Sequence, residues 1–155
     1  MTASNHYQII TDQPLSVTDA FSFIQSPVAG GQVLFTGTIR NHHEGKTVLS
    51  LEYHLFGDMA EKEITRIIAE ANSRWPLTRV YVAHKTGHCN IGDLAVIVAV
   101  SSVHRSEAFE ASRFLIDEIK HRVPIWKKET TTEGVFWVEG CNHVHSGSNH
   151  GTQKK

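Results

Sequence analysis

Apolar and polar residues alternate along several short segments, and this period of two predicts β-strands. In residues 32–40, Val33, Phe35 and Ile39 face one way, and Arg40 ends the strand on its more polar face. Residues 94–101 are apolar on both faces, which is typical of a central strand covered on both sides. The other expected strands are residues 7–11, 47–54 and 79–84, and a hairpin of residues 126–131 and 135–139.

Segments with a period of three to four residues predict helices between these strands. Ser16 is placed to cap a short first helix whose apolar face includes Phe21. Asp58 and Glu61 have capping-box spacing at the start of a second helix, which Pro76 closes. A third helix is expected from about residue 106 to 122, with a core face of Phe109, Ser112, Ile116, Ile119 and Val123.

The third helix carries cationic residues at both ends. His104 and Arg105 precede its N-terminus, where free backbone N–H groups favour an anion, although a surface arginine and a capping histidine are the simpler interpretation. Lys120 in its last turn suits the helix dipole without any further role. Lys127 and Lys128 follow in a strand, where neighbouring side chains point to opposite faces, so they are not expected to serve one site together.

Composition narrows the class of protein. The 155 residues suit one α+β domain over residues 1–140, followed by a polar tail over residues 141–155 that is expected to be disordered. A formal net charge of −1 argues against a general nucleic-acid binder. No apolar run is long enough to span a membrane, and the two cysteines do not suggest a disulfide framework. A cytoplasmic location is therefore expected.

A metal site is a competing interpretation. His84, His88 and Cys89 lie within a few residues of one another and could form a zinc corner, or a thiol nucleophile with a neighbouring base. This segment lacks a second ligand pair at a recognised spacing. The sequence also contains no phosphate-binding loop or dinucleotide fingerprint. We therefore expect neither a metal nor a cofactor.

Several short motifs resemble one known family. In order, they are Phe35-Thr36-Gly37-Thr38-Ile39-Arg40-Asn41-His42, Leu51-Glu52-Tyr53, Arg74-Trp75-Pro76-Leu77, Ser102-Val103-His104-Arg105-Ser106, Ala108-Phe109-Glu110-Ala111 and Pro124-Ile125-Trp126-Lys127-Lys128-Glu129. Together they resemble the catalytic (large) subunit of molybdopterin synthase over about residues 30–139. The resemblance implies an α/β-hammerhead-like fold with an antiparallel or mixed sheet and flanking helices. It also implies a homodimer that binds a small ubiquitin-like sulfur-carrier subunit at each end, as a heterotetramer.

The same resemblance implies a reaction and a site. The family converts cyclic pyranopterin monophosphate to the dithiolene of molybdopterin, with sulfur from the thiocarboxylated C-terminal glycine of the carrier. The implied contacts with these anions are Thr38, Ile39, Arg40, His104, Arg105, Lys120, Lys127, Lys128 and Glu129. Lys120 and Lys127 are the two implied catalytic residues. As a hypothesis, Lys127 activates or protonates the reacting pterin carbon, while Lys120 steadies the carbonyl of the carrier.

Two other classes of function remain open from the sequence. A paralogue that keeps the dimer and the carrier groove but not the chemistry would be a non-catalytic scaffold. A scaffold needs few cations, so their joint presence favours the enzyme; the residues are Arg40, His104, Arg105, Lys120 and Lys127. A metal-dependent hydrolase built on His84, His88 and Cys89 is the third class, and metal analysis of the purified protein would distinguish it.

Overall fold

A four-stranded mixed sheet forms the body of the protein. The computed structural model describes residues 4–139, and the tail expected over residues 141–155 lies outside them. The strands are β1 (His6–Thr11), β5 (Leu77–Lys85), β7 (Leu94–Ser102) and β2 (Gly31–Thr38), in the order β1-β5-β7-β2. β1 and β5 are parallel, and the other pairs are antiparallel. The expected mixed sheet is therefore confirmed.

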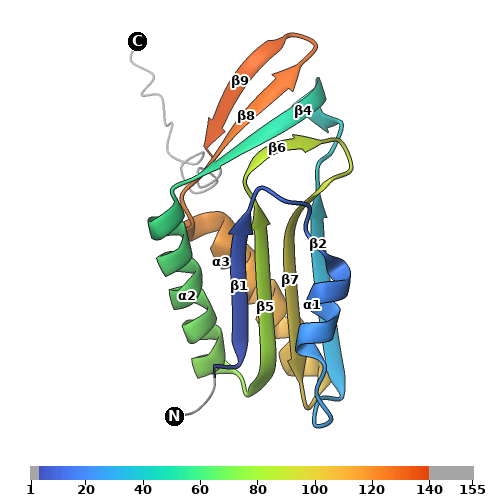
Figure 1. Cartoon of the computed structure of the whole chain (residues 1–155), viewed down its shortest axis with the longest axis vertical. Coiled ribbons are helices and arrows are strands. Elements are labelled where there is room, and N and C mark those ends of the chain that lie inside the picture. The colour runs from blue at the N-terminus through green and yellow to red at the C-terminus, as the bar shows by residue number, and fades with distance from the viewer. Residues whose placement is uncertain (1–3, 140–155) are drawn as a thin grey trace, which may run out of the picture.

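Helices cover both faces of this sheet (Figure 1). Helix α1 (Val17–Ile24) packs on one face, and α2 (Gly57–Arg74) and α3 (Arg105–Arg122) pack on the other. The central strand β7 shows the consequence, because Ile97 contributes to the core under α1 while Val98 contributes to the core under α2 and α3. Burial of alternate residues in two cores explains why this strand is apolar on both faces. None of the helices in residues 4–139 is long and apolar enough to cross a membrane.

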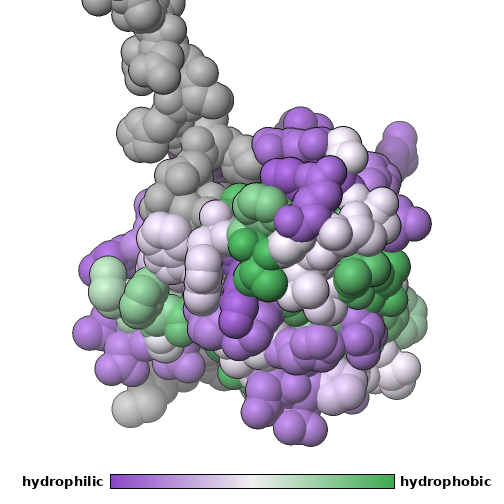
Figure 2. Space-filling model, turned by 90° about the horizontal axis from the view of Figure 1, so that it is seen from above, coloured by the Kyte–Doolittle hydropathy of each residue, from purple (hydrophilic) through white to green (hydrophobic). Residues whose placement is uncertain are grey.

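A second sheet crosses one end of the first (Figure 1). It contains β3 (His42–His43), β4 (Lys46–Leu55), β8 (Ile125–Thr131) and β9 (Gly134–Glu139), with β6 (Gly87–Asn90) also paired to β4. The expected hairpin is confirmed, since Thr131 pairs with Gly134 across its turn. Seen from above, this end of the molecule carries small apolar patches within a mostly polar surface (Figure 2).

Two predicted element ends are wrong. The strand expected over residues 32–40 ends at Thr38, after an irregularity in its pairing with β7. Ile39 then donates its backbone N–H to the carbonyl of Asp93, so Arg40 lies beyond the strand. The expected capping box is also absent, because α2 begins at Gly57 and its N-cap residue makes no side-chain bond. Asp58 instead lies in the first turn, where its charge favours the helix dipole.

Two expected core residues are exposed. Phe21 in α1 and Phe109 in α3 keep 50% and 62% of their area exposed, while the adjacent Ala20 and Ala108 are fully buried. The spacing of apolar residues along a helix predicts which positions are buried only to within about one residue. The small alanines allow each helix backbone to approach the sheet closely, and this rotates the larger side chains outward.

Candidate anion-binding site

A cavity of about 110 Å³ lies where the two sheets meet the C-terminal end of α3. It receives side chains from the end of β2, from β3, β4 and β8, and from the last turn of α3. The lining residues are Thr38, Ile39, Arg40, His42, His43, Val48, Leu51, Tyr53, Lys120, Lys127 and Glu129. The cavity therefore brings together segments that are far apart in the sequence.

The pairing of β4 with β8 builds one wall. Tyr53 lies opposite Lys127 and Leu51 lies opposite Glu129 in this antiparallel pair. Directly opposed residues share a face of the sheet, with Cβ atoms about 5 Å apart. All four side chains therefore line the cavity from the same face, although each pair is separated by more than seventy residues in the chain.

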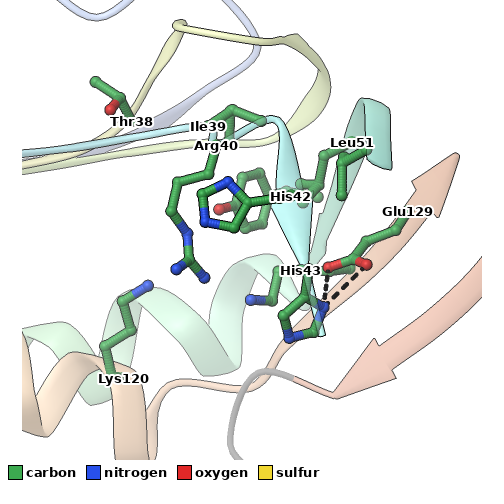
Figure 3. Close-up of a pocket in the computed structure, with 11 residues that line it drawn as sticks. Thr38, Ile39, Arg40, His42, His43, Leu51, Lys120 and Glu129 are labelled. Carbon is green, nitrogen blue, oxygen red and sulfur yellow. Dashed lines mark hydrogen bonds and ion pairs between the residues drawn. The ribbon is translucent and has the colours of Figure 1, made fainter. Parts of the chain in front are cut away.

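Lys128 lies outside the cavity. Its ammonium nitrogen lies 5.9 Å from the ring centre of Trp137, on the opposite face of β8 from Lys127. The alternation expected for the two lysines is confirmed, but the family-based contact at Lys128 is not part of this cavity. Thr38 also lines the cavity, but it lies apart from Arg40 and Lys120 in Figure 3.

Three cationic side chains converge on the cavity. Arg40 and Lys120 point toward one another in Figure 3, and Lys127 reaches the same space from β8. Desolvation, followed by repulsion from Lys127 and Arg40, lowers the pKa of Lys120 even though solvent still reaches this residue. Desolvation and the charge of Arg40 also lower the pKa of Lys127, against the opposing effect of Glu129. Both amines can therefore lose or regain a proton more readily than ordinary lysines.

A buried carboxylate faces these cations. Glu129 is only 4% exposed, and its two oxygens lie 3.0 and 3.1 Å from Nδ1 of His43. Dashed lines mark this pair in Figure 3. Sequence analysis did not identify His43, since a histidine in a polar loop has no local signal of its partner. Only the tertiary structure reveals it, because β3 and β8 pack on the two sides of β4 in the second sheet.

A buried histidine lies beneath the cavity wall. His84 is 3% exposed, its Nδ1 lies 2.8 Å from the carbonyl oxygen of Lys85, and its ring meets that of Tyr53 edge-on at 5.1 Å. Burial, with a smaller contribution from the charges of Lys120 and Lys127, lowers the pKa of His84 to about 4. The imidazole is therefore neutral at physiological pH and adds no further positive charge.

The residues considered for a metal site do not converge. Cys89 is fully buried, whereas His88 is exposed and its Nε2 lies 3.0 Å from the side-chain oxygen of Asn90. Within residues 4–139, no three His, Cys, Asp or Glu side chains form a group that could hold a metal ion. His84, His88 and Cys89 therefore do not form a shared ligand set.

His104 and Arg105 occupy a separate hollow at the other end of α3. Gly30, Val103 and Ser106 complete its lining. Arg105 and Lys120 are fifteen positions apart on one helix, which at 1.5 Å per residue separates their backbones by roughly 22 Å. One chain therefore does not bring these two residues to the same small anion.

This fold and cavity define a class of protein, a two-sheet α+β domain with a cationic cavity where its sheets meet. The MoaE protein family matches residues 10–122, and the chain belongs to this family. It is 45% identical over 134 residues to the molybdopterin synthase catalytic subunit of Yersinia pestis, covering 86% of this chain and 89% of the relative.

Solved structures extend this similarity to three dimensions. The molybdopterin synthase structure from Staphylococcus aureus superposes with a TM-score of 0.79 at 38% identity, covering 83% of this chain and 94% of that chain. A protein–protein complex of subunits 1 and 2 of molybdopterin-converting factor from Helicobacter pylori matches with a TM-score of 0.69. That match covers 87% of this chain and 90% of the other, and at 17% identity it concerns the fold alone.

Proposed function

We propose that this chain is the catalytic subunit of a molybdopterin synthase. It converts cyclic pyranopterin monophosphate to molybdopterin by placing two sulfur atoms on the pterin side chain. The sulfur comes from the thiocarboxylated C-terminus of a small ubiquitin-like carrier. The observation that carries this proposal is the convergence of Arg40, Lys120 and Lys127 on one cavity in a chain of the MoaE family.

The chemistry explains the charges. A substrate phosphate and a thiocarboxylate are both anions, and they repel one another unless fixed cations lie between them. The planar guanidinium of Arg40 offers paired N–H donors that suit an anionic oxygen. The lowered pKa values of Lys120 and Lys127 suit the reacting atoms, where a proton must move. Lys127 acts at the pterin carbon, Lys120 steadies the carrier carbonyl, and Glu129 holds the opposite charge beside Lys127.

A second copy of the chain completes the site in this proposal. The cavity of about 110 Å³ is smaller than the roughly 300 Å³ at which pockets for whole small molecules begin. β2 is an edge strand, and Phe35 on β2 and Phe109 on α3 are exposed near its outer side. A two-fold contact along this edge would bring His104 and Arg105 of one protomer toward Arg40 of its partner.

Gly31 shows how closely the end of β2 is tied to this second group of cations. A Cβ atom at Gly31 would lie 2.8 Å from Cα of Arg105, so only glycine fits there. Antiparallel pairing of two β2 strands places the Gly31 end of one against the Thr38 end of the other. The substrate phosphate then lies between the cations of two protomers, with the carrier outside them in a heterotetramer.

A cytoplasmic enzyme is part of the same proposal. Cys89 is a free, buried thiol, as is common where thiols stay reduced. The alternative is a scaffold without chemistry. Desolvating the charged groups of Lys120 and Lys127 costs free energy, and a scaffold would gain nothing in return.

The test is formation of the dithiolene product from thiocarboxylated carrier and cyclic pterin precursor. We expect Lys127→Ala to lower the turnover at least 100-fold while carrier binding is kept. Lys128→Ala is the matched control, since the neighbouring lysine lies on the other face of β8, and it should stay within about threefold of the wild type. A wild-type protein that binds the carrier but forms no product would be the scaffold instead.

A further inference from the structure

Tyr53 combines deep burial with an unused hydroxyl. It is 6% exposed, lines the cavity and lies directly opposite Lys127 in the β4–β8 pair. Its carbonyl oxygen accepts a bond from Thr86 Oγ1 at 3.3 Å, and its ring packs on His84. No residue among 4–139 makes a hydrogen bond to its phenolic hydroxyl. Among residues 4–139, the fully buried side-chain atoms without a partner are Ser101 Oγ and Glu107 Oε2, so the Tyr53 oxygen is open to the cavity, where a ligand can accept its hydrogen bond.

The electrostatic surroundings keep this hydroxyl protonated. Burial, followed by the negative charges that Cys89 and Glu129 can carry, raises the pKa of Tyr53 well above its ordinary value. The phenol is therefore a hydrogen-bond donor throughout the physiological range. It differs in this from Lys120 and Lys127, whose protons can leave.

We propose that Tyr53 is a further catalytic residue, whose hydroxyl donates a hydrogen bond to the acyl oxygen at the C-terminus of the sulfur carrier. This inference rests on the proposed function. A narrow cavity with a donor in its wall suits the thin end of an extended chain better than a bulky pterin ring. Tyr53 and Lys120 together then supply two donors for one oxygen, the arrangement that stabilises a developing oxyanion.

The step that needs these donors is the release of the carrier. When the donated sulfur is bonded to both the acyl carbon and the pterin, water adds to the acyl carbon and the carbonyl electron pair moves onto its oxygen. As that pair returns, the acyl carbon–sulfur bond breaks and sulfur leaves with the bonding electrons on the pterin. The carrier is released as a carboxylate, and the two protons of the water pass to lysine amines and solvent. Negative charge on the acyl oxygen is greatest between these events.

Carrier-binding measurements test the hydrogen bond between Tyr53 and the carrier C-terminus without requiring turnover. Tyr53→Phe removes only the hydroxyl, and its effect is measured with the carrier in its carboxylate form and with a carrier lacking its C-terminal glycine. We expect about tenfold weaker binding of the complete carrier and no change for the shortened one. Tyr81→Phe is the matched control, because Tyr81 is also 6% exposed but lies in the core under α1.

Single-turnover sulfur transfer completes the test. Loss of one oxyanion donor should slow Tyr53→Phe by about 100-fold, while Tyr81→Phe keeps the wild-type rate. Unchanged binding and rate in Tyr53→Phe, or equal weakening with both carriers, would overturn the role of Tyr53 and leave the proposed function standing. A wild-type protein that neither binds the carrier nor forms product would overturn the proposed function and this role with it.

Discussion

Acid should destabilise this protein through His84 in particular. The imidazole is 3% exposed, and its Nδ1 lies 2.8 Å from a backbone carbonyl, so the folded protein disfavours its charged form. Burial lowers its pKa from 6.5 to about 4. Between these values the unfolded chain binds a proton at His84 that the folded chain does not bind. The free energy of unfolding therefore falls as the pH falls through this window.

The structure gives the size of the effect. A drop in pKa from 6.5 to about 4, at about 1.4 kcal/mol per pH unit, corresponds to about 3 kcal/mol of stability. This stability is fully present above pH 6.5 and is lost progressively down to about pH 4. Because a typical domain has only about 5–15 kcal/mol in total, the loss should be easy to measure.

Urea unfolding at a series of pH values isolates this contribution. The variant His84→Asn keeps an N–H donor toward the carbonyl of Lys85 but cannot titrate. It should be less stable than the wild type at pH 7.5 because of lost packing, and the difference should shrink by about 3 kcal/mol toward pH 4. The exposed His88 provides the control, since His88→Asn should give a curve parallel to that of the wild type. A constant difference between wild type and His84→Asn would refute the reasoning.

Two further predictions concern the assembly and the fold. Mixing inactive Lys127→Ala with inactive Arg105→Ala should restore part of the sulfur-transfer activity. A mixed dimer would contain one site with both Lys127 and Arg105 intact, each from a different protomer. No recovery after verified subunit exchange would contradict a site shared between two protomers. Arg122→Ala should lower the free energy of unfolding in urea by about 1–2 kcal/mol, because Arg122 Nε lies 2.7 Å from the partly buried Glu63 and joins α3 to α2. Arg113→Ala, which removes an exposed pair within α3, should change it by less than about 0.5 kcal/mol.

Local patterns in the sequence predicted most of the secondary structure. A run that is apolar on both faces located the central strand β7, and a turn between two strand-like segments located the β8–β9 hairpin. Strand alternation alone separated Lys127 from Lys128. These predictions depend only on bonds and side-chain directions within a few residues. They were wrong where tertiary packing decided which of two adjacent residues is buried. Ala20 and Ala108 are buried in place of Phe21 and Phe109.

The functional residues divide in the same way. From sequence alone, cations at both ends of one helix were visible, and family motifs singled out Arg40, Lys120 and Lys127. Only the tertiary structure placed Tyr53 opposite Lys127 and His43 against Glu129, because the register between strands distant in the chain has no local signal. The sequence determined the residue types and the helices and strands that carry them, because these depend on neighbouring residues. The cavity itself exists only where segments distant in the sequence pack together.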